Sequence, residues 1–213
     1  MNHAKLLFTA SLIGFAMLPA QAKNLQTALF AGGCFWSVEK DFDHVKGVVG
    51  TISGFSGGTT TNPTYHQVSA GGTGHLETVQ VTYDADVIGY EALVNEFFHM
   101  TDVTDAGGQF CDRGEEYQTA VFVGSADQLA IAKSISEASA RLLGQGIATE
   151  ILPAGAFYPA EDYHQNFYAS NELIASGSMT KAERYKRYRE GCGRDARVQQ
   201  LWGSQAFSVT HAG

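Results

Sequence analysis

Residues 27–45, which read TALFAGGCFWSVEKDFDHV, decide how the fold begins. The apolar run at 27–31 ends at two glycines and predicts a buried strand. Beyond the glycines, apolar side chains recur at spacings of three and four from Phe35 to Val45, which predicts a helix that opens at Cys34. A strand therefore leads through a tight glycine turn directly into a helix.

The remaining elements follow in an order typical of an α+β protein. Hydrophobic periodicity predicts further strands at 47–58, 76–83, 117–123 and 149–152, and helices at 90–100, 126–143 and 180–189. Two strands follow each other without a helix between them, so an α+β sandwich is favoured over a doubly wound sheet. Within the third strand, Glu77 shares a face with Val79 and Val81.

We expect a single domain over 23–213, in which 168–213 forms an irregular C-terminal tail. Residues 1–22 have a positively charged start, an apolar run at 6–18 and the small-x-small ending AQA. This pattern predicts a signal peptide that is cleaved after Ala22, and the apolar run is short for a membrane-spanning helix. The mature protein is therefore expected to be periplasmic or secreted and free of the membrane.

Composition and charge argue against several classes of protein. The chain has 213 residues, with 14 Lys and Arg against 22 Asp and Glu, so its net charge is −8. This balance argues against nucleic-acid binding, which needs cations to contact phosphates. Three cysteines are too few for a disulfide scaffold, and they show none of the Cys/His spacings of a metal site. We expect no bound metal.

Cys34 carries the sharpest chemical signal among the single residues. At a helix N-terminus, free N–H groups and the helix dipole favour an anion, so we expect an accessible thiol whose pKa lies below about 8.5. The alternative is a small buried cysteine that serves only as an apolar side chain. Position alone leaves both interpretations open.

Several short motifs follow one another between residues 27 and 167. They read GCFW at 33–36, GFSGG at 54–58, NPTY at 62–65, TGHLE at 73–77, DRGEEY at 112–117 and AEDYHQ at 160–165. In this order they resemble the signatures of A-type peptide methionine sulfoxide reductases, and several ordered motifs are more specific than one. The resemblance implies a two-layer α+β sandwich with a ferredoxin-like core. It also implies thiol-dependent reduction of methionine S-sulfoxide, free or in proteins, to methionine.

The resemblance further implies a role for each matching residue. Cys34 would be the nucleophile that attacks the sulfoxide sulfur. Glu77 would protonate the sulfoxide oxygen, for which an apolar setting must raise the pKa of its carboxyl group. Tyr117 would donate a hydrogen bond to the same oxygen, and Asp112 would orient the site.

Substrate binding is expected to fall to aromatic residues. Phe35 and Trp36 would form an apolar pocket for the S-methyl group, with Phe55 and His164 as further binding residues. The GFSGG segment has Phe55 where the family usually has a tyrosine, so one phenolic donor is missing there. We therefore expect Phe55 to line the pocket without acting in catalysis, and the chemical step to be slower.

Recycling requires a second thiol, because the reaction leaves Cys34 as a sulfenic acid. We expect Cys192 to resolve it, because glycines and basic residues flank it and the family similarly uses a C-terminal cysteine. Three roles stay open for Cys111: it relays the disulfide from Cys192, resolves Cys34 directly, or pairs structurally with Cys192. Thioredoxin or an exported thioredoxin-like dithiol would reduce the final disulfide, and no organic cofactor is expected. We expect a monomer.

Two other functions stay open when the residues are considered alone. A thiol peroxidase or a Cys–His hydrolase would also use Cys34, the hydrolase with His75 or His164 as its base. A non-catalytic exported binding module would bury Cys34 and join Cys111 to Cys192. Thiol titration with methionine sulfoxide separates them, since only a reductase loses two thiols and releases methionine.

Overall fold

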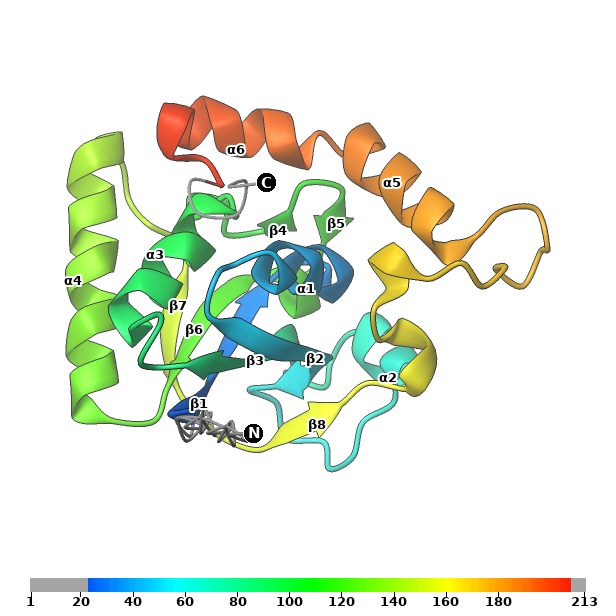
Figure 1. Cartoon of the computed structure of the whole chain (residues 1–213), viewed down its shortest axis with the longest axis horizontal. Helices are drawn as coiled ribbons and strands as arrows, with labels where there is room; N and C mark the ends of the chain where they lie inside the picture. The colour runs from blue at the N-terminus through cyan, green and yellow to red at the C-terminus, as the bar shows by residue number, and fades with distance from the viewer. Residues whose placement is uncertain (1–22, 208–213) are drawn as a thin grey trace, which may run out of the picture.

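A six-stranded mixed sheet forms the centre of the protein, in the order β7-β6-β1-β3-β2-β8 (Figure 1). The computed structural model describes residues 23–207, so the expected signal peptide at 1–22 lies outside the described residues. Neighbouring strands are antiparallel except β6 and β7, which are parallel. The strands span Leu25–Gly32 (β1), Val48–Ser56 (β2), Leu76–Asp84 (β3), Thr119–Val123 (β6), Glu150–Pro153 (β7) and Phe157–Pro159 (β8), and a separate ladder pairs Gly108–Gln109 (β4) with Asp112–Arg113 (β5).

Helices pack around this sheet. They span Phe35–Asp43 (α1), Tyr65–Ser69 (α2), Tyr90–His99 (α3), Ala126–Leu143 (α4), Lys181–Gly191 (α5) and Arg194–Trp202 (α6), with 3-10 turns at Glu115–Tyr117 (η1), Asp162–His164 (η2), Phe167–Ala169 (η3) and Gly203–Gln205 (η4). Phe30 of β1 stacks on Phe42 of α1 and on Phe97 of α3, with ring centroids 4.9 and 5.1 Å away, so both helices cover one face of β1. The α+β class is confirmed, while the two-layer ferredoxin-like core stays a prediction.

Local signals in the sequence account for several helix ends. Ser125 accepts a hydrogen bond from the backbone of Gln128 at the start of α4, and Gly144 ends the helix in the left-handed conformation (φ 64°). Thr180 and Glu183 form a capping box at the start of α5. No helix within 23–207 is long and apolar enough to cross a bilayer.

The alternation of side chains along β3 places one carboxylate in the core. Glu77 lies on the same face as Val79 and Val81, all three buried, as the sequence predicts. That face is the one that α1 covers, since Phe35 and Val79 belong to the same apolar cluster. Glu77 therefore ends up next to the start of α1.

From Lys181 to Trp202 the C-terminal segment forms two helices that are fixed to the core, so the expected irregular tail is wrong there, while the helix predicted at 180–189 is confirmed. Arg189 of α5 pairs with Asp41 of α1 at 2.9 Å. Arg194, 2% exposed, donates to the carbonyls of Gly32 at 3.3 Å and Met100 at 3.0 Å. The arginines make the segment appear solvent-exposed in the sequence, yet these two form buried contacts that hold α5 and α6 in place.

Candidate active site

Cys34 borders a cavity of about 190 Å³ at the start of α1. Segments from across the chain line it: Cys34, Phe35 and Trp36, then Tyr65 of α2, Glu77 of β3, Asp112 of β5, Tyr117 of η1, and Arg184 and Tyr188 of α5. Four of the motifs quoted above thus meet in one place. The expected catalytic residues Cys34, Glu77, Asp112 and Tyr117 all lie on its wall.

The glycine turn before Cys34 sets the position of its sulfur. Cys34 is the N-cap of α1, and its carbonyl accepts a hydrogen bond from the backbone N–H of Ser37 at 3.0 Å. Gly33 has a φ of 77°, and a Cβ atom there would lie 2.4 Å from the Cβ of Gln109. Only glycine fits this turn, because a side chain would be both strained and obstructed.

The electrostatics of the thiol overturn one expectation. Cys34 is 7% exposed, and its burial raises the pKa of the thiol well above the ordinary value, with the charges of Glu77 and Asp112 acting in the same direction. Hydrogen bonds from the Trp36 backbone and the Tyr188 side chain lower the pKa by less. The predicted low pKa of the thiol is therefore wrong, because desolvation by burial outweighs the helix terminus, while the residue still borders the cavity.

Glu77 lies beside Cys34 at the N-terminus of α1. Its Oε2 accepts a hydrogen bond from the backbone N–H of Phe35 at 2.9 Å, and the residue is 2% exposed. Burial raises the pKa of this carboxyl group to about 8, against the opposing effect of the Phe35 hydrogen bond and with smaller contributions from Asp112 and Glu116. A proton therefore stays on Glu77 at neutral pH, within the same cavity as the sulfur.

Three tyrosines line the cavity, and only Tyr117 is among the residues predicted from the sequence. Burial raises the phenol pKa of Tyr65, Tyr117 and Tyr188, so all three stay protonated and able to donate a hydrogen bond. Tyr188 donates to the carboxylate of Asp112. Tyr65 belongs to the NPTY motif, which could have revealed it, whereas no motif marks Tyr188.

Aromatic packing fixes the opposite wall. Trp36 stacks on Phe167 with ring centroids 3.8 Å apart, and its Nε1 donates to Nδ1 of His164 at 3.2 Å. His164 does not line this cavity but an adjacent groove. Phe55 is fully buried behind Phe35, with ring centroids 5.9 Å apart. It does not line the cavity, so the expectation that it would is wrong. The position at which the family usually has a tyrosine is therefore part of the core in this protein.

Comparison with known proteins assigns the family. Residues 26–204 match the family described as peptide methionine sulfoxide reductase. The chain belongs to this family. Peptide methionine sulfoxide reductase MsrA 2 of Rhizobium meliloti (strain 1021) is 45% identical over 208 residues, which cover 97% of this chain and 99% of that one. The chain is thus an oxidoreductase of the MsrA type.

Solved structures of the same reductases share the fold. Methionine sulfoxide reductase A of Corynebacterium diphtheriae is 34% identical, with a TM-score of 0.65 over 72% of this chain and 82% of that one. Mxr1 from Saccharomyces cerevisiae in reduced form is 31% identical, with a TM-score of 0.64 over 74% and 91%. Reductases of this family take electrons from thiols and use no organic cofactor.

The cysteines of this reductase are present as one disulfide and one free thiol. Cys111 and Cys192 are bonded, with Cα atoms 5.2 Å apart, and Cys34 is free. Cys111 precedes Asp112, and the backbone N–H of Cys192 bonds to the carbonyl of Tyr188. Each cysteine of the disulfide therefore lies next to a residue that lines the cavity. Of the three roles left open for Cys111, both the relay from Cys192 and the structural pairing with Cys192 produce this bond.

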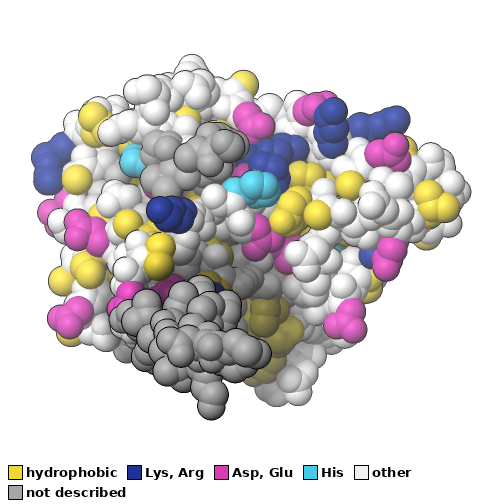
Figure 2. Space-filling model, viewed as in Figure 1, with side chains coloured by type: hydrophobic (Ala, Val, Ile, Leu, Met, Phe, Trp, Pro, Cys, Tyr) yellow, Lys and Arg dark blue, Asp and Glu magenta, His cyan; other side chains and the backbone are white. Residues whose placement is uncertain are grey.

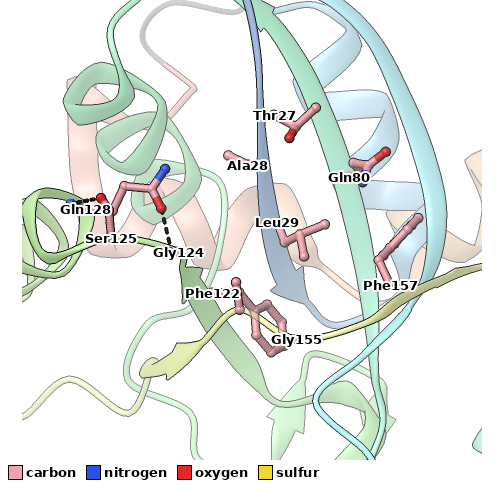
Figure 3. A pocket seen from close by; sticks show the side chains of 11 residues that line it. Thr27, Ala28, Leu29, Gln80, Phe122, Gly124, Ser125, Gln128, Gly155 and Phe157 are labelled. Atoms are coloured by element: carbon pink, nitrogen blue, oxygen red, sulfur yellow. Dashed lines mark hydrogen bonds between the residues drawn. The ribbon is translucent and has the colours of Figure 1, made fainter.

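One cavity away from the catalytic residues offers little chemistry of its own. A cavity of about 490 Å³ lies beside β1, β3 and β6, where Leu29, Gln80 and Phe122 line it (Figure 3). None of the described residues that line it has an acidic, basic or thiol side chain. Within the described residues, no group of three or more His, Cys, Asp or Glu side chains could hold a metal ion.

Proposed function

We propose that this reductase converts methionine S-sulfoxide, free or in proteins, to methionine by attack of Cys34 on the sulfoxide sulfur. The observation that carries the proposal is one small aromatic cavity in which Cys34 adjoins the buried, protonated carboxyl group of Glu77. A nucleophile and an acid in one water-poor site are what the reaction requires.

The first step forms a sulfur–sulfur contact and transfers an oxygen atom. The Cys34 thiolate attacks the sulfoxide sulfur while the Glu77 carboxyl group gives its proton to the sulfoxide oxygen. The attack makes a bond between the two sulfur atoms. Transfer of the hydroxyl group to the Cys34 sulfur then breaks this bond and the sulfur–oxygen bond of the substrate, which leaves methionine, Cys34 sulfenic acid and the Glu77 carboxylate. The sulfoxide is reduced by two electrons and Cys34 is oxidised by two. Because the attack needs a thiolate and a protonated carboxyl group, Cys34 and Glu77 together carry one proton in the reactive form.

The tyrosines stabilise the developing charge on oxygen. Tyr65 and Tyr117 line the cavity on the side of Glu77, and each keeps a phenolic proton for donation. Asp112 orients the wall through its hydrogen bond with Tyr188. Phe35 and Trp36 supply the apolar surface for the S-methyl group.

Recycling proceeds in three exchanges. The Cys192 thiol condenses with Cys34 sulfenic acid to form a Cys34–Cys192 disulfide and water. The Cys111 thiolate then attacks the Cys192 sulfur, which releases Cys34 and forms the Cys111–Cys192 disulfide. An external dithiol of the thioredoxin type reduces that disulfide. Support comes from the Cys111–Cys192 pair next to the cavity and from Gly193, whose φ of 67° gives the chain a bend directly after Cys192.

The compartment follows from the N-terminal sequence. Residues 1–22 carry a signal-peptide pattern, so we assign the enzyme to the periplasm or the exterior, where it repairs oxidised proteins as a monomer. The dithiol donor is then an exported thioredoxin-like protein.

The test is thiol counting during a single turnover without external reductant. When one equivalent of methionine S-sulfoxide is added, the fully reduced enzyme should lose two of three thiols and release one methionine for each molecule. Cys34→Ser should release none. Thiol loss with peroxide but not with sulfoxide would indicate a thiol peroxidase, and inertness to both would indicate a binding module.

A further inference from the structure

A second groove, of about 450 Å³, opens directly beside the catalytic cavity. Trp36, Tyr65 and Arg184 line both hollows, so the two adjoin. The catalytic cavity alone, at about 190 Å³, has room for little more than a methionine side chain. Anything attached to that side chain in a peptide must extend into the neighbouring space.

The groove presents apolar side chains that no part of the described chain covers. Tyr163 is 50% exposed and Leu173 is 63% exposed, and both lie on its rim. Leu173 belongs to the loop between η3 and α5, which projects from the edge of the molecule (Figure 1). Exposed apolar side chains around a concave surface are typical of a binding site.

One cation at the junction of the two hollows has no ion-pair partner within residues 23–207. Arg184 is exposed and makes no ion pair or side-chain hydrogen bond there. On the same helix, Lys181 pairs with Glu172 and Lys186 with Glu190, and acidic and basic side chains lie close together in the region of α5 in Figure 2. An unpaired guanidinium offers a planar, two-pronged site for a carboxylate.

We propose that this groove binds the peptide that flanks the methionine sulfoxide, with an apolar neighbour against Trp36 and Leu173 and a carboxylate at Arg184. The inference rests on the proposed function, because the sulfoxide must occupy the adjoining cavity. The carboxylate belongs either to an acidic residue next in the chain or to the C-terminus of a peptide that ends at the sulfoxide.

The experiment compares matched substrates on the full enzyme. N-acetyl-methionine-S-sulfoxide amide is the unflanked substrate, and blocked peptides place Leu on one side of the sulfoxide and Asp or Asn on the other, in both orders. A peptide that ends at the sulfoxide, as acid or amide, tests the second source of the carboxylate. In the native enzyme, kcat/KM should be about two- to fivefold higher for the charged member of one pair, which is the range of exposed ion pairs.

Variants then assign the preference to Arg184. Arg184→Gln should bring the charged-to-neutral ratio to about one, Arg184→Lys should keep part of it, and the control Lys186→Gln should leave it unchanged. Leu173→Ser should lower the ratio of flanked to unflanked substrate about threefold through lost apolar contact. Added salt should reduce the Asp preference.

The outcomes separate the two proposals. A charged-to-neutral ratio of one in every pair, or a ratio that Arg184→Gln leaves intact, overturns the groove assignment while reduction of the unflanked amide still supports the catalytic proposal. No reduction of any sulfoxide would refute the catalytic proposal itself and with it this inference.

Discussion

The proton inventory of Glu77 and Cys34 gives a sharp prediction for the pH dependence of the enzyme. At pH 7 roughly nine-tenths of Glu77 is protonated, since its pKa is about 8, and the thiol is protonated because its pKa lies higher. The two groups then hold two protons, one more than the reactive form. In single turnovers, kcat/KM should rise about tenfold per pH unit up to about pH 8 and then level off.

The substitution Glu77→Gln removes the proton donor without changing the size of the side chain. An amide cannot protonate the sulfoxide oxygen, so kcat/KM should fall by about 10² to 10⁴. The break near pH 8 should vanish, because the remaining titrating group is a thiol whose pKa burial keeps high. Glu115→Gln is the control, since Glu115 is exposed in η1 and does not line the cavity.

The assay is the release of methionine from methionine S-sulfoxide by reduced enzyme, followed from about pH 6 to about pH 10 for the three proteins. Circular dichroism and urea unfolding show whether each variant is folded. An unchanged break near pH 8 in Glu77→Gln, or activity within about threefold of the native enzyme, would refute the assignment of Glu77 as the acid.

Three further predictions concern recycling and stability. With a thioredoxin-type reductant, Cys192→Ser should release one equivalent of methionine and then stop. Normal cycling in Cys192→Ser, together with a stall in Cys111→Ser, would instead assign resolution to Cys111. Cys34→Ser should release no methionine while keeping the Cys111–Cys192 disulfide, as mass mapping would report. Asp41→Asn should lower the free energy of unfolding by about 3–5 kcal/mol in urea titrations, because buried Arg194 then has no ion-pair partner within residues 23–207 and buried Arg189 keeps only Asp195. A loss under about 1 kcal/mol would contradict that role.

Periodicity predicted the elements that carry the site because their signals are local. The helix at 126–143 has the same limits in the structure, since a serine cap and a left-handed glycine bound it. Alternation along β3 likewise predicted that Glu77 faces the core. Such features depend on neighbours within a few residues, so a single sequence contains them.

Features that depend on residues far away in the sequence could not be predicted. The pKa of the Cys34 thiol depends first on its burial and then on Glu77 and Asp112, and only the folded chain brings these about. Tyr188 becomes part of the site because buried arginine contacts on either side of Cys192 fix α5 against α1. A run of basic residues does not reveal these contacts, because the sequence does not show which arginines are buried and which are exposed.

The short strands at both edges of the sheet affect how the chain behaves during its synthesis, before it is complete. β7 has four residues and β8 three, each ends in proline, and together they cover the longer strands β6 and β2. Short, proline-containing borders discourage pairing with a second molecule. Both borders come late in the chain, so a product truncated before residue 150 leaves the nine-residue β2 unprotected, and we expect such fragments to self-associate.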